Sequence, residues 1–156
     1  MPPGAKQDEY LAKRRPQCHD LLVVRKYKSG SSTKHRLMVH LVWCPKYRRR
    51  ILLGEVAKRL YELFKQAAEV NDWQIHEMNI QRDHVHMLIQ YNPRESISSV
   101  VHLIKGGSSR VLRQEFPDLE EFLWGDSFWS DGYFAESVGA VHEDMIKDYI
   151  KNQNKS

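Results

Sequence analysis

A turn at residues 81–83 restricts the fold of this chain more than any other feature of the sequence. Strand-like segments lie on both sides of the turn, over residues 73–80 and 84–90, and the second alternates between two faces. Residues 55–70 and 96–116 carry apolar side chains at helical spacing, and Ser96 is a suitable N-cap for the second helix. The sequence therefore predicts a β-hairpin between two amphipathic helices.

Two more strand-like segments and a third helix complete the pattern. Residues 35–44 are mostly apolar and stop at Pro45, which suits a central strand, and residues 128–138 predict a strand bent at Gly132. The last helix is expected over residues 142–153. This order predicts an α+β fold: a ferredoxin-like, RRM-like β-α-β-β-α-β antiparallel sheet with an additional C-terminal helix that carries Tyr149. Gly106 and Gly107 should mark a kink or a close backbone approach in the second helix.

The first 34 residues differ from the rest in composition. They are polar and basic, and residues 28–34 have the composition of a flexible linker. We therefore expect a partly flexible N-terminal arm over residues 1–34 and one domain over residues 35–156, since 156 residues suffice for a single real core.

Charge and cysteine content limit the environment and the partners. A net charge of +4, a pI near 9.1 and basic clusters at residues 13–15, 25–28 and 46–50 indicate a polyanionic partner. Cys18 and Cys44 cannot form a disulfide framework, which fits a reducing compartment. No apolar run approaches the roughly 18 residues of a membrane span. The sequence predicts a cytoplasmic protein without membrane contact.

The strand after the turn carries His84 and His86 on one face. Two neutral imidazoles side by side can hold a divalent cation if a third ligand comes from elsewhere. The same pattern also fits two ordinary surface histidines on a strand. A second feature is needed to choose between these interpretations.

Tyr149 and Gln153 supply that feature, because residues four apart share one face of a helix. The Gln153 carbonyl oxygen could join His84 and His86 around one cation, while Tyr149 presents its phenol to a phosphate. A phenol with a pKa of ~10 is a poor nucleophile at neutral pH and needs a cation that polarises the phosphate. These residues predict in-line attack by Tyr149, a covalent phosphotyrosine and no nucleotide cofactor.

Five segments in one order resemble the single-tyrosine transposases of the IS200/IS605 type, which belong to the His-hydrophobe-His (HUH) superfamily of single-strand nucleases. They are residues 39–49, 82–86, 105–110, 129–134 and 149–153. The resemblance implies that His84, His86 and Gln153 bind Mg²⁺ or Mn²⁺ and that Tyr149 forms a 5′-phosphotyrosine with a free 3′-OH. It also implies single-stranded DNA with hairpins at the ends of an insertion element as substrate. A homodimer is implied as well, with active sites completed between subunits.

Several other residues could take part in catalysis, metal binding or DNA binding. Tyr133 is a rival nucleophile, but it lies in a strand-like segment where tyrosines are usually packed. His40 is expected to be structural, although its strand position could place it near the metal. His76 and His102 are expected to have no role in the site. The four tryptophans are expected in the core rather than stacked on bases; they are Trp43, Trp73, Trp124 and Trp129. The expected DNA-phosphate contacts are Arg48, Arg49, Arg50, Lys105 and Arg110.

The main functional prediction is a DNA transposase that cleaves and rejoins single strands with a divalent metal. A domesticated nuclease acting on repeat hairpins, or a replication or mobilisation nickase, could use the same chemistry. A non-catalytic module of RNA-recognition shape, binding single strands on an open sheet, is the alternative from a different class.

Overall fold

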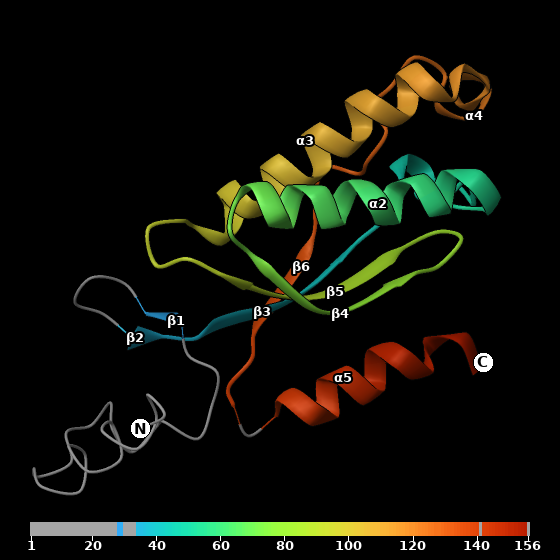
Figure 1. Ribbon diagram of the computed structural model, residues 1–156. Coiled ribbons are helices and arrows are strands. Elements are labelled where there is room, and N and C mark those ends of the chain that lie inside the picture. The colour runs from blue at the N-terminus through green and yellow to red at the C-terminus, as the bar shows by residue number, and fades with distance from the viewer. Residues whose placement is uncertain (1–27, 30–33, 141, 156) are drawn as a thin grey trace, which may run out of the picture. The chain divides into compact units, whose positions relative to one another are not determined.

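The computed structural model describes residues 28–29, 34–140 and 142–155 (Figure 1). The chain divides into two compact units, residues 1–36 and 37–156. In the first unit, the described residues form a short antiparallel ladder between β1 (Lys28–Ser29) and β2 (Lys34–His35). Most of the predicted N-terminal arm lies outside the described residues, so that boundary stays a prediction.

The second unit contains the predicted strands and helices. In chain order they are β3 (Leu37–Trp43), the 3-10 turn η2 (Lys46–Arg48), α2 (Gly54–Val70), β4 (Gln74–Ile80), β5 (Val85–Tyr91), α3 (Ile97–Glu115), the 3-10 turn η3 (Pro117–Leu119), α4 (Glu120–Leu123), β6 (Phe134–Ser137), α5 (Glu143–Lys151) and the 3-10 turn η4 (Asn152–Lys155). The Ser96 side chain caps α3 by accepting a hydrogen bond from the Ser99 amide at 3.1 Å, as predicted.

The four strands form one antiparallel sheet in the order β4-β5-β3-β6. Because the first and third strands of this unit lie in the middle, the predicted ferredoxin-like fold is confirmed. The two central strands, β3 and β5, are almost entirely buried. His40 lies on β3 and His86 on β5, and His84 directly precedes β5.

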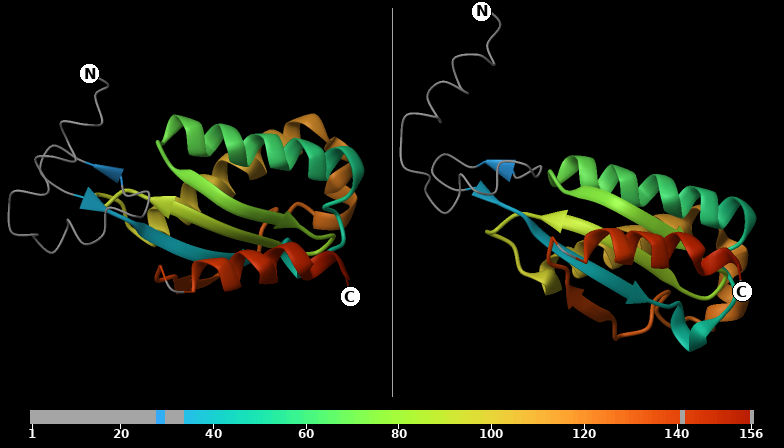
Figure 2. Two further views of the ribbon diagram at one scale, coloured as in Figure 1. Left: turned by 60° about the horizontal axis from the view of Figure 1, so that its bottom comes forward. Right: turned by 90° about the horizontal axis from the view of Figure 1, so that it is seen from below.

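Helices cover both faces of the sheet. In Figure 1, α2 and α3 lie on one face and α5 lies on the other, and Figure 2 shows α5 crossing the strands. The larger core lies under α2 and α3 and includes Trp43, Trp73 and Trp129, as predicted. Trp124 is 72% exposed, so its predicted burial is wrong. Trp124 follows α4 in a left-handed conformation (φ 52°), and its ring lies beside Arg49 and Tyr47 instead of in the core.

A small second core fixes α5 to the sheet. Met38, Leu88, Val138 and Ile150 are buried together, with Ile146 packed against them. The Ile150 carbonyl also accepts a hydrogen bond from Asn79 Nδ2 at 3.0 Å. The extra helix therefore covers the face that the bare ferredoxin-like pattern leaves open.

Truncation of Ile150 should loosen this attachment. Ile150→Ala removes the fully buried side chain of α5, and we expect it to lower the free energy of unfolding by about 2–4 kcal/mol in urea denaturation. Met145→Ala is the matched control, because Met145 is 60% exposed on the same helix and should change stability by less than about 0.5 kcal/mol. Equal effects of the two substitutions would contradict the packing described here.

Three sequence predictions need correction. The last strand covers only Phe134–Ser137, and residues 128–133 form a loop with a single bridge from Trp129 to Pro45. That loop is held by a side chain, because Lys105 Nζ donates to the carbonyl oxygens of Ser130 (2.5 Å) and Gly132 (3.2 Å). The last α-helix ends at Lys151, and a 3-10 turn follows it. The glycine pair sits in a continuous helix, and no atom lies within 4 Å of a Cβ placed there, so the expected close approach is absent among the described residues.

Candidate active site

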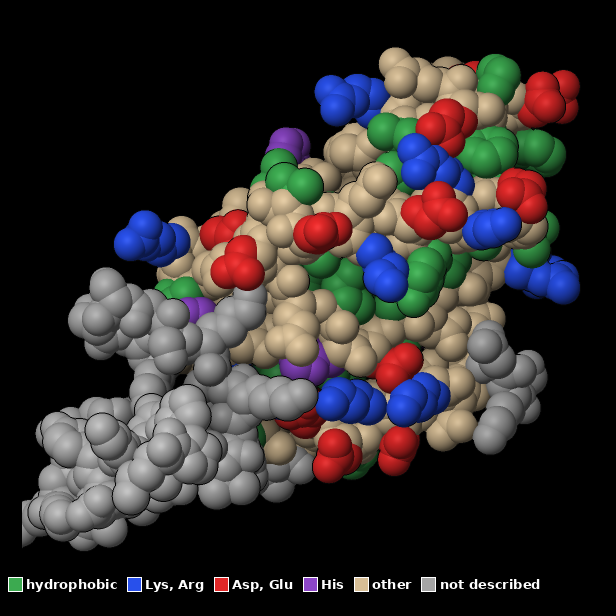
Figure 3. All heavy atoms as spheres, in the orientation of Figure 1, with side chains coloured by type: hydrophobic (Ala, Val, Ile, Leu, Met, Phe, Trp, Pro, Cys, Tyr) green, Lys and Arg blue, Asp and Glu red, His purple; other side chains and the backbone are tan. Residues whose placement is uncertain are grey.

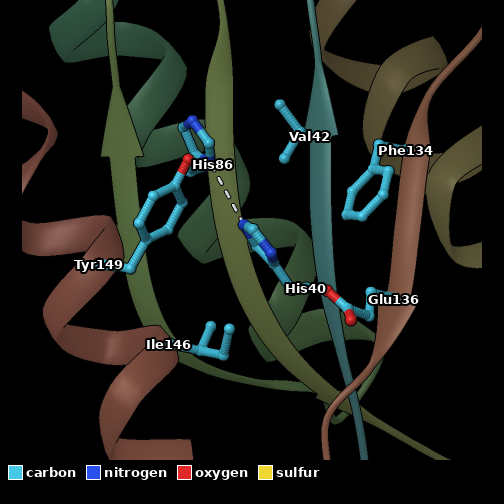
Figure 4. Close-up of a pocket in the computed structure, with 7 residues that line it drawn as sticks. All are labelled: His40, Val42, His86, Phe134, Glu136, Ile146 and Tyr149. Carbon is cyan, nitrogen blue, oxygen red and sulfur yellow. Dashed lines mark hydrogen bonds between the residues drawn. The ribbon is translucent and has the colours of Figure 1, made fainter.

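A cavity of about 480 Å³ lies between α5 and the sheet (Figure 4). Strands β3, β5 and β6 form its floor, and α5 forms its wall. Its lining consists of His40, Val42, His86, Phe134, Glu136, Ile146 and Tyr149. The alternation of side chains along β3 and β5 brings their lining residues to the α5 face, while the neighbouring residues enter the larger core.

The two predicted metal ligands lie next to each other at the edge of this cavity. His84 directly precedes β5 and His86 is its second residue. Their ring centroids are 5.0 Å apart, and the ring planes meet at 78°. His86 is buried and His84 is partly exposed. The structure thus places the pair where a ligand could approach both rings.

Each imidazole has a partner on its Nδ1 atom. His84 Nδ1 lies 2.7 Å from Asp83 Oδ1, and His86 Nδ1 lies 3.1 Å from His40 Nε2. Histidines that bind a metal through one nitrogen commonly hold the other in such a contact, which fixes the orientation of the ring. The Nδ1 contacts leave Nε2 of each ring as the nitrogen for a metal. This donor arrangement fits a divalent cation.

Burial keeps His86 neutral. Burial is the main cause that lowers the pKa of His86 to about 4, and the nearby His84 and His40 lower it further. A neutral imidazole has the free lone pair that metal binding requires. The buried environment therefore favours the ligand form of His86 at neutral pH.

His40 belongs to the same site. It is buried, stacks on the His86 ring at 15° between planes, and lies opposite Glu136 in the pairing of β3 with β6. Figure 4 shows the Glu136 side chain beside it. Burial lowers the pKa of His40, while the Glu136 charge opposes this effect. The structural role predicted for His40 stays a prediction. Its strand position left open that it could lie near the metal, and the structure places its Nε2 atom 3.1 Å from His86 Nδ1.

Tyr149 faces both histidines from α5. Its ring centroid is 5.7 Å from that of His86 and 6.1 Å from that of His40, with edge-to-face geometry in both pairs. The side chain is 52% exposed, so a ligand from solvent can reach it. Because α5 packs on its own sheet, Tyr149 lies beside the histidines of the same chain.

The rival Tyr133 lies elsewhere. It lines a separate, smaller cavity of about 220 Å³ with Lys105 and Asp131. Neither His84 nor His86 lines that cavity. Of the two tyrosines, the structure brings Tyr149 to the paired imidazoles.

Gln153 lies in η4, one turn beyond Tyr149. Its Nε2 donates to the Tyr149 carbonyl oxygen at 3.4 Å. Among the described residues, no group of three or more His, Cys, Asp or Glu side chains could hold a metal. A metal at His84 and His86 would therefore need a different third ligand, such as an amide oxygen. The role of Gln153 stays a prediction.

The predicted phosphate contacts differ in their surroundings. Arg50 and Arg110 are exposed, whereas Arg48 is paired with Asp83 at 3.1 Å. Lys105 is partly buried against loop carbonyl groups, and burial lowers its pKa. On the face drawn in Figure 3, acidic and basic side chains are mixed rather than separated. DNA contact by Arg48, Arg49, Arg50, Lys105 and Arg110 stays a prediction.

The site thus brings together imidazoles that could hold a divalent cation and a tyrosine that a ligand can reach from solvent. Comparison with known proteins makes the assignment specific. The family described as "Transposase IS200 like" matches residues 33–153, and the chain belongs to this family.

Two curated relatives are also named as transposases. The ISDra2 transposase TnpA of Deinococcus radiodurans is 35% identical over 127 residues, which cover 81% of this chain and 91% of that protein. The transposase for insertion sequence element IS200 of Salmonella typhimurium is 35% identical over 126 residues, which cover 81% and 82% of the two chains.

Solved structures agree in fold. A crystal structure described as a candidate transposase from Deinococcus radiodurans has a TM-score of 0.67 at 32% identity and covers 81% of this chain and 97% of its own. A REP-associated tyrosine transposase bound to a REP hairpin has a TM-score of 0.60 at 12% identity and covers 81% and 73%. In the described part of this chain, no helix is long and apolar enough to span a membrane.

Proposed function

We propose that this transposase cleaves and rejoins single-stranded DNA at the ends of an insertion element, with Tyr149 as the nucleophile. The observation that carries the proposal is the position of the Tyr149 ring, 5.7 Å from that of His86 in one cavity open to solvent. Membership of the transposase family supports DNA as the substrate.

The proposed reaction is a reversible transfer of a phosphoryl group. Tyr149 Oη attacks the scissile phosphorus, the bond from phosphorus to O3′ breaks, and a 5′-phosphotyrosine and a free 3′-OH result. The phenol loses one proton to solvent and the leaving O3′ gains one, so the step needs no redox partner. The tyrosyl ester conserves the energy of the phosphodiester, so a 3′-OH can reverse the attack without a nucleotide cofactor.

The proposed cofactor is Mg²⁺ or Mn²⁺, held by Nε2 of His84, Nε2 of His86 and the Gln153 carbonyl oxygen. When bound, such an ion supplies Lewis-acid polarisation of the phosphate. The protein residues orient this site: Asp83 holds the His84 ring and His40 holds the His86 ring.

The substrate and assembly are proposed from the family. We expect hairpins near the ends of the element to be bound, which agrees with the hairpin named for the REP-associated relative. We also expect a homodimer joined through its sheets, in which the tyrosine helix can complete the partner's site. Light scattering on the purified protein would test the dimer. The module that binds strands on an open sheet is disfavoured, because α5 packs on that face.

His40→Phe should weaken metal binding without removing a ligand. The substitution deletes the Nε2 contact that orients His86, and such contacts commonly contribute 10- to 100-fold to metal affinity. We therefore expect Mn²⁺ affinity, measured by electron paramagnetic resonance without DNA, to fall roughly 10- to 100-fold. His102→Phe, on the exposed face of α3, is the control and should bind Mn²⁺ normally. Unchanged affinity in His40→Phe would show that this contact does not position His86.

The function itself is tested by covalent capture. Labelled single-stranded oligonucleotides from both strands of the DNA flanking the gene are incubated with the protein and Mg²⁺. We expect a denaturant-resistant protein–DNA adduct with one strand. Tight, salt-sensitive binding with no adduct on either strand would instead favour a non-catalytic binding module.

A further inference from the structure

Tyr47, Arg49 and Trp124 form an exposed group outside the cavity, which we call the ring cluster. The guanidinium carbon of Arg49 lies 4.9 Å from the Trp124 ring centroid and 6.0 Å from that of Tyr47. The two rings are 6.0 Å apart. Trp124 is 72% exposed and Tyr47 is 55% exposed, so both rings offer apolar surface to solvent.

The ring cluster is held by specific contacts between two loops. Tyr47 Oη donates to Asp126 Oδ2 at 2.8 Å, and the Lys46 amide donates to the Phe128 carbonyl oxygen at 2.8 Å. Tyr47 and Trp124 both have left-handed backbone conformations, with φ of 59° and 52°. Such conformations are unfavourable for aromatic residues and tend to occur at functional sites. The fold keeps two strained residues and leaves both rings exposed.

The charge of Arg49 is available to a ligand. Among the described residues, Arg49 has no carboxylate partner; its Nε atom is buried without a hydrogen-bond partner, while the residue as a whole is partly exposed. Its neighbours differ, since Arg48 pairs with Asp83 and Lys46 lies 3.9 Å from Asp126. The ring cluster thus combines aromatic faces with an uncompensated cation. This is the combination that binds unpaired bases and the adjoining phosphates.

The ring cluster is connected to the turn that carries His84. Arg48 Nε lies 3.1 Å from Asp83 Oδ2, and the other oxygen of Asp83 contacts His84 Nδ1 at 2.7 Å. The Leu52 amide also donates to the Arg82 carbonyl oxygen at 3.0 Å. The loop bearing Tyr47 and Arg49 is therefore bonded to the loop bearing the candidate metal ligand. A DNA strand bound at His84 and His86 could therefore extend onto the ring cluster.

We propose that the ring cluster is a subsite for one unpaired base of the single-stranded DNA substrate. The base stacks on Trp124, and Arg49 contacts an adjoining phosphate. This inference rests on the proposed function for the choice of DNA and adds a contact outside the cavity that holds Tyr149.

The test measures the affinity of the full chain for a single-stranded oligonucleotide that gives the covalent adduct. Trp124→Leu removes the aromatic face and should weaken binding at least roughly fivefold, whereas Trp124→Phe should retain most of the affinity. Oligonucleotides with one abasic position at a time should reveal a nucleotide whose base supports binding to the wild type but not to Trp124→Leu. Tyr61→Leu is the matched control, because Tyr61 is 47% exposed with Lys65 Nζ 5.5 Å from its ring, and its affinity should not change.

Three other results would each overturn the proposed subsite. Equal affinity of Trp124→Leu and wild type, with the adduct retained, would remove the subsite and leave the proposed function intact. A change of oligomeric state without loss of DNA binding would make the ring cluster an interface between copies of the chain. Failure of the wild type to bind or capture any single strand would overturn the subsite and the proposed function together.

Discussion

Tyr149→Phe should abolish the covalent protein–DNA adduct while leaving DNA binding intact. The substitution removes one oxygen atom, and the 52% exposed side chain keeps its ring packed edge-on to His40 and His86. Because removing a nucleophile eliminates the covalent step, we expect adduct formation to fall by on the order of 10⁴-fold or more. Denaturing electrophoresis measures the adduct, and fluorescence anisotropy measures the affinity.

Tyr133→Phe provides the matched control for this experiment. Tyr133 is also exposed, but it lines the separate cavity beside Lys105, so its substitution should leave the adduct unchanged. The opposite outcome, with the adduct lost in Tyr133→Phe and kept in Tyr149→Phe, would transfer the nucleophile to Tyr133. Loss of DNA binding in Tyr149→Phe would mean that the phenol contributes to affinity rather than to the covalent step.

The periodicity of apolar residues was sufficient to predict most of the fold, because α2, α3 and the two central strands bury regularly spaced apolar side chains. The apolar residues of α2 and α3 lie over the sheet, and β5 presents Met87 to the larger core and Leu88 to the smaller one. Prediction failed where a single side chain decides the backbone path. Residues 128–133 have strand-like composition, yet Lys105 binds the carbonyl oxygens of Ser130 and Gly132. Because this contact joins residues 25 or more positions apart, the sequence of residues 128–133 alone does not reveal it.

The candidate site was likewise predictable from local spacing only in part. The spacing of His84 with His86 placed both on one strand face, and the structure puts Tyr149 over that face. His40 and Glu136 could not be assigned in this way. Their positions depend on the register of β3 with β5 and β6, which pairs His40 with Leu88 and with Glu136. Register depends on the whole sheet, so the hydrogen bond between His40 and His86 had no signature in either segment alone.

Removing one imidazole of the pair, by His84→Ala or His86→Ala, should eliminate tight Mn²⁺ binding and with it the adduct. The loss of a cation that stabilises transition-state charge costs several kcal/mol, so we expect capture of DNA to slow by on the order of 10³-fold. EDTA should have the same effect on the wild type, and added Mg²⁺ or Mn²⁺ should reverse it. His84→Ala tests the ligand role most directly, since His84 is the more exposed of the pair and its loss should disturb packing less.

Separate readouts distinguish a ligand role from a structural one. His84→Ala should keep the wild-type unfolding midpoint in EDTA to within a few degrees, and both variants should still bind the oligonucleotide. His102→Ala controls for the loss of an exposed imidazole and should bind metal and form the adduct normally. An adduct that persists in EDTA, or in both His84→Ala and His86→Ala, would contradict a metal at this pair. In that case the two rings would not act as metal ligands, and their role would be limited to the packing contacts that they make with each other and with Tyr149.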